Sequence, residues 1–273
     1  MYKLVCVDMD GTLLNSNKSV SDFTKDVIHK ASESGVQVII CTGRLYASAI
    51  YYQDLIDSKN AIITSNGAYI KDTSRNKIIY ESRFRVETLD QITSTLRKYG
   101  IVPELHTFNS VVSEQSGLST KFYVNVNNRM SKEKRINLKN VNSMRNYYLD
   151  DNNHVLKCIG MDNDLDKIKK VKSELKKMPD IEVVSSNINN VEIMNKGVSK
   201  GQGVKILSEY LNISKDEVVC IGDNENDLSM IQYAGCGVAM GNGDECIKKE
   251  ANYITDTNDN DGVAKVILKI LGR

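Results

Sequence analysis

The sequence predicts an α/β protein with a parallel β-sheet core and a second α/β domain inserted into the chain. Two observations carry this prediction. Short apolar runs alternate with helical segments near both ends of the 273-residue chain, as in proteins built on a parallel sheet. Between these parts lies a stretch rich in Asn, Lys and Ser, with strand-like and helix-like segments of its own. A chain of this length can hold two modest domains.

The N-terminal part contains short apolar runs that are rich in β-branched side chains, which predicts buried strands. The predicted strands span residues 4–7, 36–41 and 61–64. A helix is expected within residues 19–35, with Gly35 as its C-terminal stop, and another over 45–56. The predicted apolar face of the first helix consists of Phe23, Val27, Ile28 and Ala31.

The C-terminal part repeats this alternation. Strands are predicted over residues 218–221 and 237–240, and helices over 199–211, 228–233 and 262–271. The two ends of the chain therefore form one core, residues 1–83 and 187–273, whose strands we expect to share one parallel sheet.

The middle of the chain, residues 84–186, is predicted to be the inserted α/β domain. Its strand-like runs cover residues 121–126, 155–161 and 181–184, and its helix-like runs cover 86–99 and 165–178. The insertion lies between two of the motifs described below, so all of these motifs belong to the core.

Composition excludes several classes of protein. The 36 Lys and Arg nearly balance 35 Asp and Glu, so nothing suggests nucleic acid or a membrane surface as a partner. No apolar run approaches the ~20 residues of a membrane span, and the N-terminus lacks a signal-peptide pattern, so we expect a cytoplasmic protein. The cysteines form no C-x-x-C pair and are expected to be structural. They are Cys6, Cys41, Cys158, Cys220, Cys236 and Cys246.

The first candidate site motif, D-x-D-G-T, follows the first predicted strand directly. It places Asp8 and Asp10 where ligands bind in open α/β sheets. One carboxylate can attack phosphorus and bind a hard cation, and the other can exchange a proton with the leaving oxygen and with water. The alternative is an acidic turn that caps a helix.

Two weaker motifs mark candidate anion sites. Thr42 and Gly43 lie between a strand and a helix, where a hydroxyl and free backbone N–H groups can bind phosphate, although an ordinary N-cap is the alternative. Lys200 opens a predicted helix, where its charge opposes the helix dipole. A phosphate or carboxylate could hold it there, and a solvated lysine is the alternative.

The fourth motif, G-D-N-E-N-D, follows the strand over residues 218–221. It brings Asp223, Asn226 and Asp227 to the same sheet edge. Carboxylate and amide oxygens suit Mg²⁺, which prefers one or two carboxylates together with phosphate and water. Acidic helix capping is the alternative.

These motifs, in this order, resemble the haloacid-dehalogenase-like superfamily of phosphotransferases. The match extends from Leu4 to the closing helix. The inserted segment resembles the large α/β cap of the Cof-type subfamily, and Ser65-Asn66-Gly67-Ala68 resembles that subfamily's turn after a strand. The resemblance implies a Rossmann-like parallel-sheet core with an inserted α/β cap domain.

The resemblance also implies a role for each motif residue. Asp8 would be the nucleophile and Asp10 the general acid/base. Mg²⁺ would be held by the Asp8 carboxylate, the Asp10 backbone carbonyl and Asp223, with Asp227 in support. The residues implied to bind the substrate phosphate are Thr42, Gly43, Lys200 and Asn226.

The predicted function is that of a Mg²⁺-dependent phosphatase that hydrolyses small phosphate monoesters, such as sugar phosphates, through an aspartyl-phosphate on Asp8. Two alternatives stay open: a sugar phosphomutase of the same fold, and a non-catalytic sensor of a phosphorylated ligand. The complete acidic set argues against a sensor. The expected partner is a small phosphorylated metabolite, and the expected state is a monomer or homodimer.

Overall fold

The computed structural model describes residues 1–272 and divides into two compact units, in agreement with the predicted α/β class. The core unit comprises Met1–Gly43, Tyr52–Tyr80 and the chain from Ser199 onward. The inserted unit comprises Arg44–Tyr51 and Glu81–Val198. Each unit has its own β-sheet.

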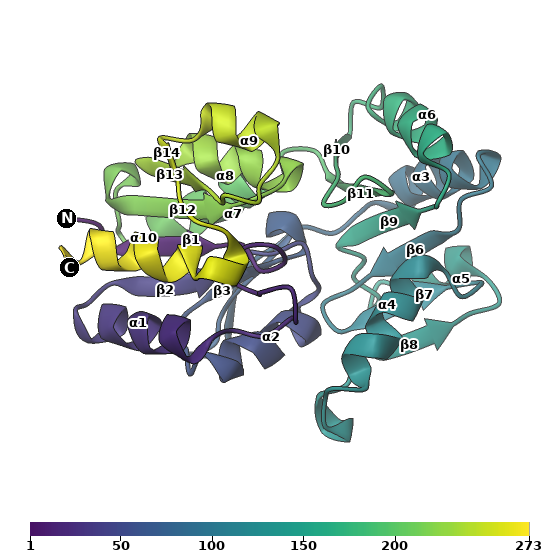
Figure 1. The fold of residues 1–273 in the computed structure, drawn as a ribbon. Coiled ribbons are helices and arrows are strands. Elements are labelled where there is room, and N and C mark those ends of the chain that lie inside the picture. Colours follow the sequence, from purple (N-terminus) through teal and green to yellow (C-terminus); the bar gives the residue numbers. More distant parts are fainter. Residues whose placement is uncertain (273) are drawn as a thin grey trace. The chain divides into compact units, whose positions relative to one another are not determined.

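The core unit is built on a five-stranded sheet with the order β14-β13-β12-β1-β2 (Figure 1). All its neighbouring strands pair in parallel. The strands are β1 (Leu4–Val7), β2 (Gln37–Ile40), β12 (Val218–Gly222), β13 (Cys236–Ala239) and β14 (Tyr253–Ile254). Every residue of β1 is buried, which explains why this strand is apolar throughout rather than alternating.

A second, three-stranded sheet in the core unit has the order β3-β4-β5. Its strands are β3 (Ile62–Thr64), β4 (Tyr69–Asp72) and β5 (Lys77–Glu81). A parallel bridge between Cys41 and Ile63 places β3 beside the end of β2. The turn after β3 therefore lies at the same edge as the loop after β2.

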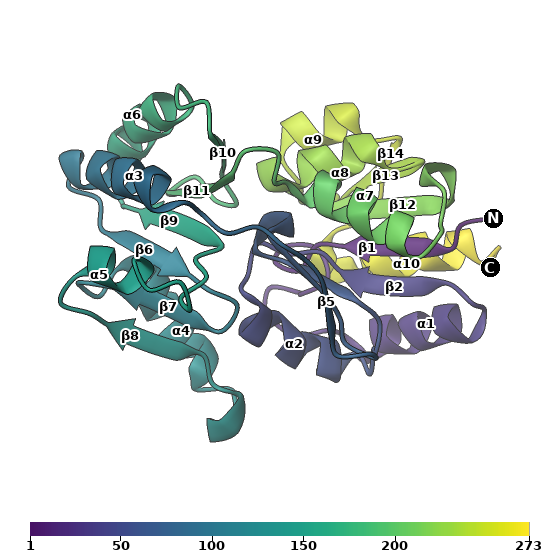
Figure 2. The ribbon, with the colours of Figure 1, turned by 180° about the vertical axis from the view of Figure 1, so that it is seen from behind.

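Helices cover both faces of the five-stranded sheet, with α7 and α10 on opposite sides (Figures 1 and 2). On one side, Leu4 and Cys6 of β1 share an apolar cluster with Val204 and Leu207 of α7. The core helices are α1 (Asp22–Glu33), α7 (Lys200–Tyr210), α8 (Leu228–Tyr233), α9 (Glu245–Glu250) and α10 (Gly262–Ile270). Helix α2 (Tyr46–Leu55) is divided between the two units at Tyr52. Short 3₁₀ turns cover Ser65–Gly67, Lys215–Glu217, Glu225–Asp227 and Asn258–Asn260.

The inserted unit contains a mixed six-stranded sheet with the order β10-β11-β9-β6-β7-β8. The strands are β6 (Pro103–His106), β7 (Ser110–Ser113), β8 (Asn137–Asn140), β9 (Lys157–Met161), β10 (Ile181–Val184) and β11 (Asn190–Asn195). The helices are α3 (Val86–Lys98), α4 (Leu118–Asn127), α5 (Met144–Tyr148) and α6 (Leu165–Leu175), and Lys132–Lys134 form a 3₁₀ turn.

The two faces of this sheet differ in polarity. One face packs against α3, α5 and α6 through an apolar cluster that includes Leu96, Leu105 and Val171. The strand residues on the opposite face of the sheet include four buried ionisable side chains. They are Glu104, His106, Lys157 and Glu192.

Three details differ from the sequence predictions. Residues 121–126 lie in helix α4, because Tyr123 and Val126 are buried three residues apart and the Glu104 carboxylate accepts the first backbone N–H groups of that helix. Phe23 is 47% exposed, and Thr24 takes its place on the buried face of α1. The inserted unit extends to Val198, because β11 pairs with β9 and β10.

The cysteines are free thiols, and four of the six are buried. Among the helices of residues 1–272, none is long and apolar enough to cross a membrane.

Candidate active site

The carboxyl edge of the core sheet gathers the residues of all four motifs. Asp8 follows β1 directly and is only 6% exposed. The chain then turns at Gly11, whose φ is +82°. A Cβ atom there would lie 2.3 Å from Asp223 Oδ2, so glycine allows the first motif to approach the fourth.

Lys200 is fully buried at the first position of α7 and lies between two carboxylates. Its ammonium group contacts Asp8 Oδ1 at 2.5 Å and Asp227 Oδ1 at 2.5 Å. These contacts explain why a lysine occupies a helix N-terminus, where the helix dipole disfavours a cation. Two buried carboxylates hold it there.

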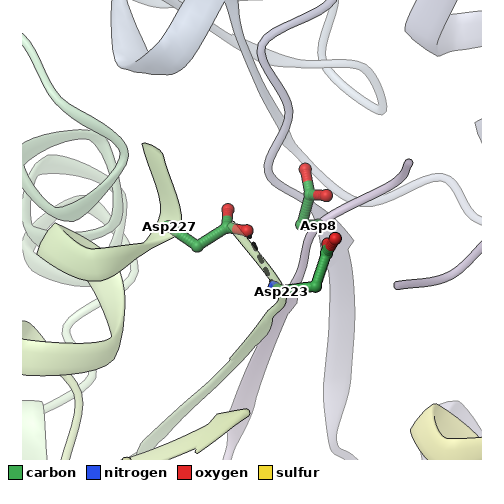
Figure 3. A group of neighbouring side chains, drawn as sticks. All are labelled: Asp8, Asp223 and Asp227. Carbon is green, nitrogen blue, oxygen red and sulfur yellow. Dashed lines mark hydrogen bonds between the residues drawn. The ribbon is translucent and has the colours of Figure 1, made fainter. Parts of the chain in front are cut away.

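Asp227 organises the loop after β12. Its Oδ2 accepts hydrogen bonds from the backbone N–H groups of Asp223 and Asn224, both at 3.0 Å. Figure 3 shows the bond to Asp223 and the three neighbouring carboxyl groups. Since Asp227 Oδ1 contacts Lys200, both oxygens of Asp227 already have protein partners. Asp227 therefore links the acidic loop to the lysine.

Burial and mutual repulsion raise the pKa values of the acidic side chains. Burial, and then the Asp227 carboxylate, raise the pKa of Asp8 well above its usual value, although Lys200 opposes the shift. Burial and Asp227 raise the pKa of Asp223 to about 7, although Thr12 donates to Asp223 Oδ1 at 2.7 Å. Burial alone would lower the pKa of Lys200, but the carboxylates of Asp227 and Asp8 raise it overall.

This cluster fits a divalent cation. Asp8, Asp223 and Asp227 each offer an oxygen within 4.8 Å of the others. The cluster contains three carboxylates and one ammonium, that of Lys200, which contacts two of them, so the ionised cluster carries an excess of two negative charges. Carboxylate oxygens are the ligands that Mg²⁺ prefers, and its charge would balance that excess. Asp8 and Asp223 are the better candidate ligands, because Asp227 is occupied by protein donors.

The remaining motif residues lie at the same edge of the sheet. Thr42 follows β2 and is 2% exposed, and its backbone N–H donates to Ile63 O at 2.9 Å. Gly43 comes next and is half-buried. Asn226 is 6% exposed, and its Nδ2 donates to Asn66 Oδ1 at 3.2 Å. The Asp10 carboxylate is partly exposed and accepts a hydrogen bond from Lys18 Nζ at 3.1 Å.

Comparison with known proteins defines the class. The sequence model of the haloacid dehalogenase-like hydrolase family matches residues 5–267, so the chain belongs to this family. Its curated relatives include several that are named as phosphatases. The family resemblance inferred from the four motifs is thereby confirmed.

Individual relatives match over nearly their whole length. The chain is 30% identical over 267 residues to the 5-amino-6-(5-phospho-D-ribitylamino)uracil phosphatase YcsE of Bacillus subtilis, with 97% of this chain and 94% of the relative covered. It is 31% identical to the putative phosphatase YxeH of the same organism, with 99% of both covered. A haloacid dehalogenase-like hydrolase structure from B. subtilis superposes with a TM-score of 0.86 at 28% identity, with 97% of this chain and 98% of that chain covered.

The structure brings Asp8, Asp223, Asp227 and Lys200 together. The other predicted residues lie at the same sheet edge, and the chemical roles assigned to all of them stay predictions. Three contacts were not anticipated. Lys18 binds Asp10, and no sequence signal marks it. Thr12 binds Asp223, and its place within D-x-D-G-T is a signal that could have found it. Asn66 binds Asn226, and the family resemblance marks the turn that contains Asn66 but implies no role for it.

Proposed function

We propose that this enzyme is a Mg²⁺-dependent phosphatase that hydrolyses small phosphate monoesters through an aspartyl-phosphate on Asp8. The observation that carries the proposal is the position of Asp8. Its buried carboxylate lies at the tip of a strand, and one oxygen contacts the Lys200 ammonium. Asp8 can therefore present Oδ1 to the cations, Lys200 and Mg²⁺, and Oδ2 to phosphorus.

The first half-reaction forms a bond between Asp8 and phosphorus and breaks the bond from phosphorus to the leaving oxygen. Asp10 donates its proton to that oxygen. Lys200 offsets the repulsion between the Asp8 carboxylate and the phosphate dianion, and Thr42, Gly43 and Asn226 donate hydrogen bonds to the phosphate oxygens. When held by Asp8, Asp223 and the Asp10 carbonyl, Mg²⁺ supplies further positive charge against the phosphate oxygens.

The second half-reaction releases phosphate. Asp10, now ionised, takes a proton from a water molecule whose oxygen forms a bond to phosphorus. The bond between phosphorus and Asp8 breaks, which restores the free carboxylate. Asp10 is suited to both proton transfers because it is partly exposed, unlike Asp8, and can exchange protons with solvent.

The relatives favour a small, phosphorylated metabolite as the substrate. Three of them in B. subtilis are named as phosphatases of 5-amino-6-(5-phospho-D-ribitylamino)uracil, at 28–30% identity over nearly the whole chain. That ribityl phosphate therefore belongs among the first substrates to test, together with sugar phosphates.

The test is phosphate release from a panel of monoesters, with and without Mg²⁺. The panel should include 5-amino-6-(5-phospho-D-ribitylamino)uracil, hexose phosphates, a phosphopeptide and a bisphosphorylated sugar. We expect Mg²⁺-dependent release from several small monoesters and none from Asp8→Asn. Full activity after removal of all divalent metal, or faster release from the phosphopeptide than from any metabolite, would contradict the proposal. Isomerised sugar phosphate in place of free phosphate would identify a mutase.

A further inference from the structure

The turn Ser65–Gly67, which follows β3, has an unusual backbone. Its three consecutive residues have positive φ angles of 51°, 56° and 96°. Glycine adopts this region freely, but each of the two other residues incurs a cost of roughly 1–2 kcal/mol. Such a conformation persists only where surrounding contacts determine it, and it is most often found at functional sites.

The contacts of this turn lead to three of the four site motifs. The Asn66 backbone N–H donates to Thr42 O at 3.1 Å. The Asn66 side-chain oxygen accepts from Asn226 Nδ2 at 3.2 Å. A Cβ atom on Gly67 would lie 2.3 Å from Ser199 O, immediately before Lys200, so the turn packs closely against the start of α7. Asn66 itself is 1% exposed.

The Asn226 side chain depends on this turn for its orientation. Asn226 is buried, and its Oδ1 atom has no hydrogen-bond partner among residues 1–272. Its Nδ2 group carries two hydrogens, and the bond to Asn66 uses one of them. The second hydrogen remains available to a phosphate oxygen. An amide held through one bond would rotate between alternative orientations if that bond were removed.

We propose that Asn66 is a positioning residue of the phosphate site: it orients the Asn226 amide so that a donor faces the phosphate. The left-handed backbone of Asn66 makes this possible, because it lets the backbone N–H bind the Thr42 segment while the side chain binds Asn226. This inference rests on the proposed function for its relevance to turnover, but it is tested by the binding of inorganic phosphate alone.

The principal variant is Asn66→Gly, which keeps the backbone conformation accessible and removes the side-chain amide, including the oxygen that accepts from Asn226. The matched control is Asn76→Gly. Asn76 also has a positive φ, of 51°, but it is exposed in the turn between β4 and β5. Asn66→Ala, which removes the same acceptor, replaces Asn66→Gly if that variant does not fold. Calorimetry with inorganic phosphate and Mg²⁺ measures the dissociation constant.

Asn66→Gly should weaken phosphate binding about two- to tenfold, the effect of one hydrogen bond, whereas Asn76→Gly should leave it unchanged. In an Asn226→Ala background, Asn66→Gly should cause no further loss beyond about twofold, because the two residues act through one contact. Turnover of a monoester should show a raised KM with a smaller change in kcat. If Asn66 were important only for general stability, Asn66→Gly would lower the melting temperature but would not show these effects on phosphate affinity and KM.

Unchanged phosphate affinity in Asn66→Gly would overturn the inference, as would losses that multiply in the double variant. If no monoester is hydrolysed but phosphate binds as described, the proposed function fails and the positioning role stands. If the wild-type protein binds no phosphate in the presence of Mg²⁺, both fail.

Discussion

Replacing Lys200 by Met would leave the carboxylates of Asp8 and Asp227 buried without their cation. Lys200 has no exposed surface, and Asp8 and Asp227 have 8% and 0% of their side-chain surface exposed. Removing one partner of a buried ion pair typically costs about 3–5 kcal/mol of folding stability. We therefore expect Lys200→Met to lower the free energy of unfolding by about that amount at about pH 8.

Acidification should restore part of this loss. Without Lys200, the buried carboxyl groups have higher pKa values in the folded state than in the unfolded state. The folded state then binds more protons, so stability rises as the pH falls. Each proton taken up on folding contributes at most about 1.4 kcal/mol per pH unit.

The assay is urea denaturation followed by circular dichroism at about pH 8 and about pH 6. Lys205→Met is the matched control, because Lys205 lies in the same helix with 49% of its side chain exposed, and its ammonium group makes a long contact to Glu209, at 4.0 Å. It should change stability by about 0.5 kcal/mol or less. The reasoning is refuted if Lys200→Met is as stable as the control at the higher pH, or if its deficit is the same at both pH values.

Three further results are expected. Asp10→Asn should slow phosphoryl transfer to Asp8, measured as release of the leaving group in a single turnover, by about 10²–10⁴-fold for alkyl phosphates and by much less for aryl phosphates with acidic leaving groups, and an equal loss for both classes in that step would argue against an acid role. The affinity for Mg²⁺, measured by calorimetry, should rise by up to about tenfold for each unit of increasing pH until the Asp223 pKa of about 7 is reached, because the cation displaces a proton from that carboxyl group. An affinity that does not depend on pH would contradict the assigned ligands. Burial, and then the Lys157 charge, lower the pKa of buried His106. As the pH falls, the unfolded state therefore protonates this imidazole before the folded state does, which favours unfolding. Below about pH 6.5, the stability of the wild type should fall more steeply than that of His106→Gln. Parallel urea titrations would detect this difference, and identical slopes would exclude His106 as its source.

The core fold and its site could be predicted because both depend on local sequence signals. Four-residue apolar runs such as Leu4–Val7 identify strands that are buried on both faces. Each motif follows such a strand or begins the next helix, and parallel strands bring these positions to one edge. The contact between Lys200 and Asp8 joins residues 192 positions apart. The sequence predicted only that a phosphate or carboxylate could hold the lysine at its helix N-terminus, and it did not identify the partner.

The inserted unit was harder to predict because tertiary contacts determine its elements. Residues 121–126 carry aromatic and β-branched side chains that favour a strand, but Tyr123 and Val126 are buried at helical spacing in α4. Strand β8, with the sequence Asn-Leu-Lys-Asn, has little apolar character and is ordered by its pairing with β7. The Asn66–Asn226 contact could not be predicted either, because it depends on two side-chain orientations rather than on strand order.

Chemical trapping of the phosphoenzyme tests the central claim, that Asp8 carries the phosphoryl group during turnover. The enzyme would be mixed with Mg²⁺ and a monoester, quenched rapidly and treated with borohydride, which reduces an aspartyl-phosphate to homoserine. Peptide mass spectrometry then locates the modified residue. We predict homoserine at position 8 in the wild type and unmodified peptide in the absence of substrate. Rapid phosphate release with no modification at Asp8 at any quench time, or modification at a different carboxylate, would contradict the account.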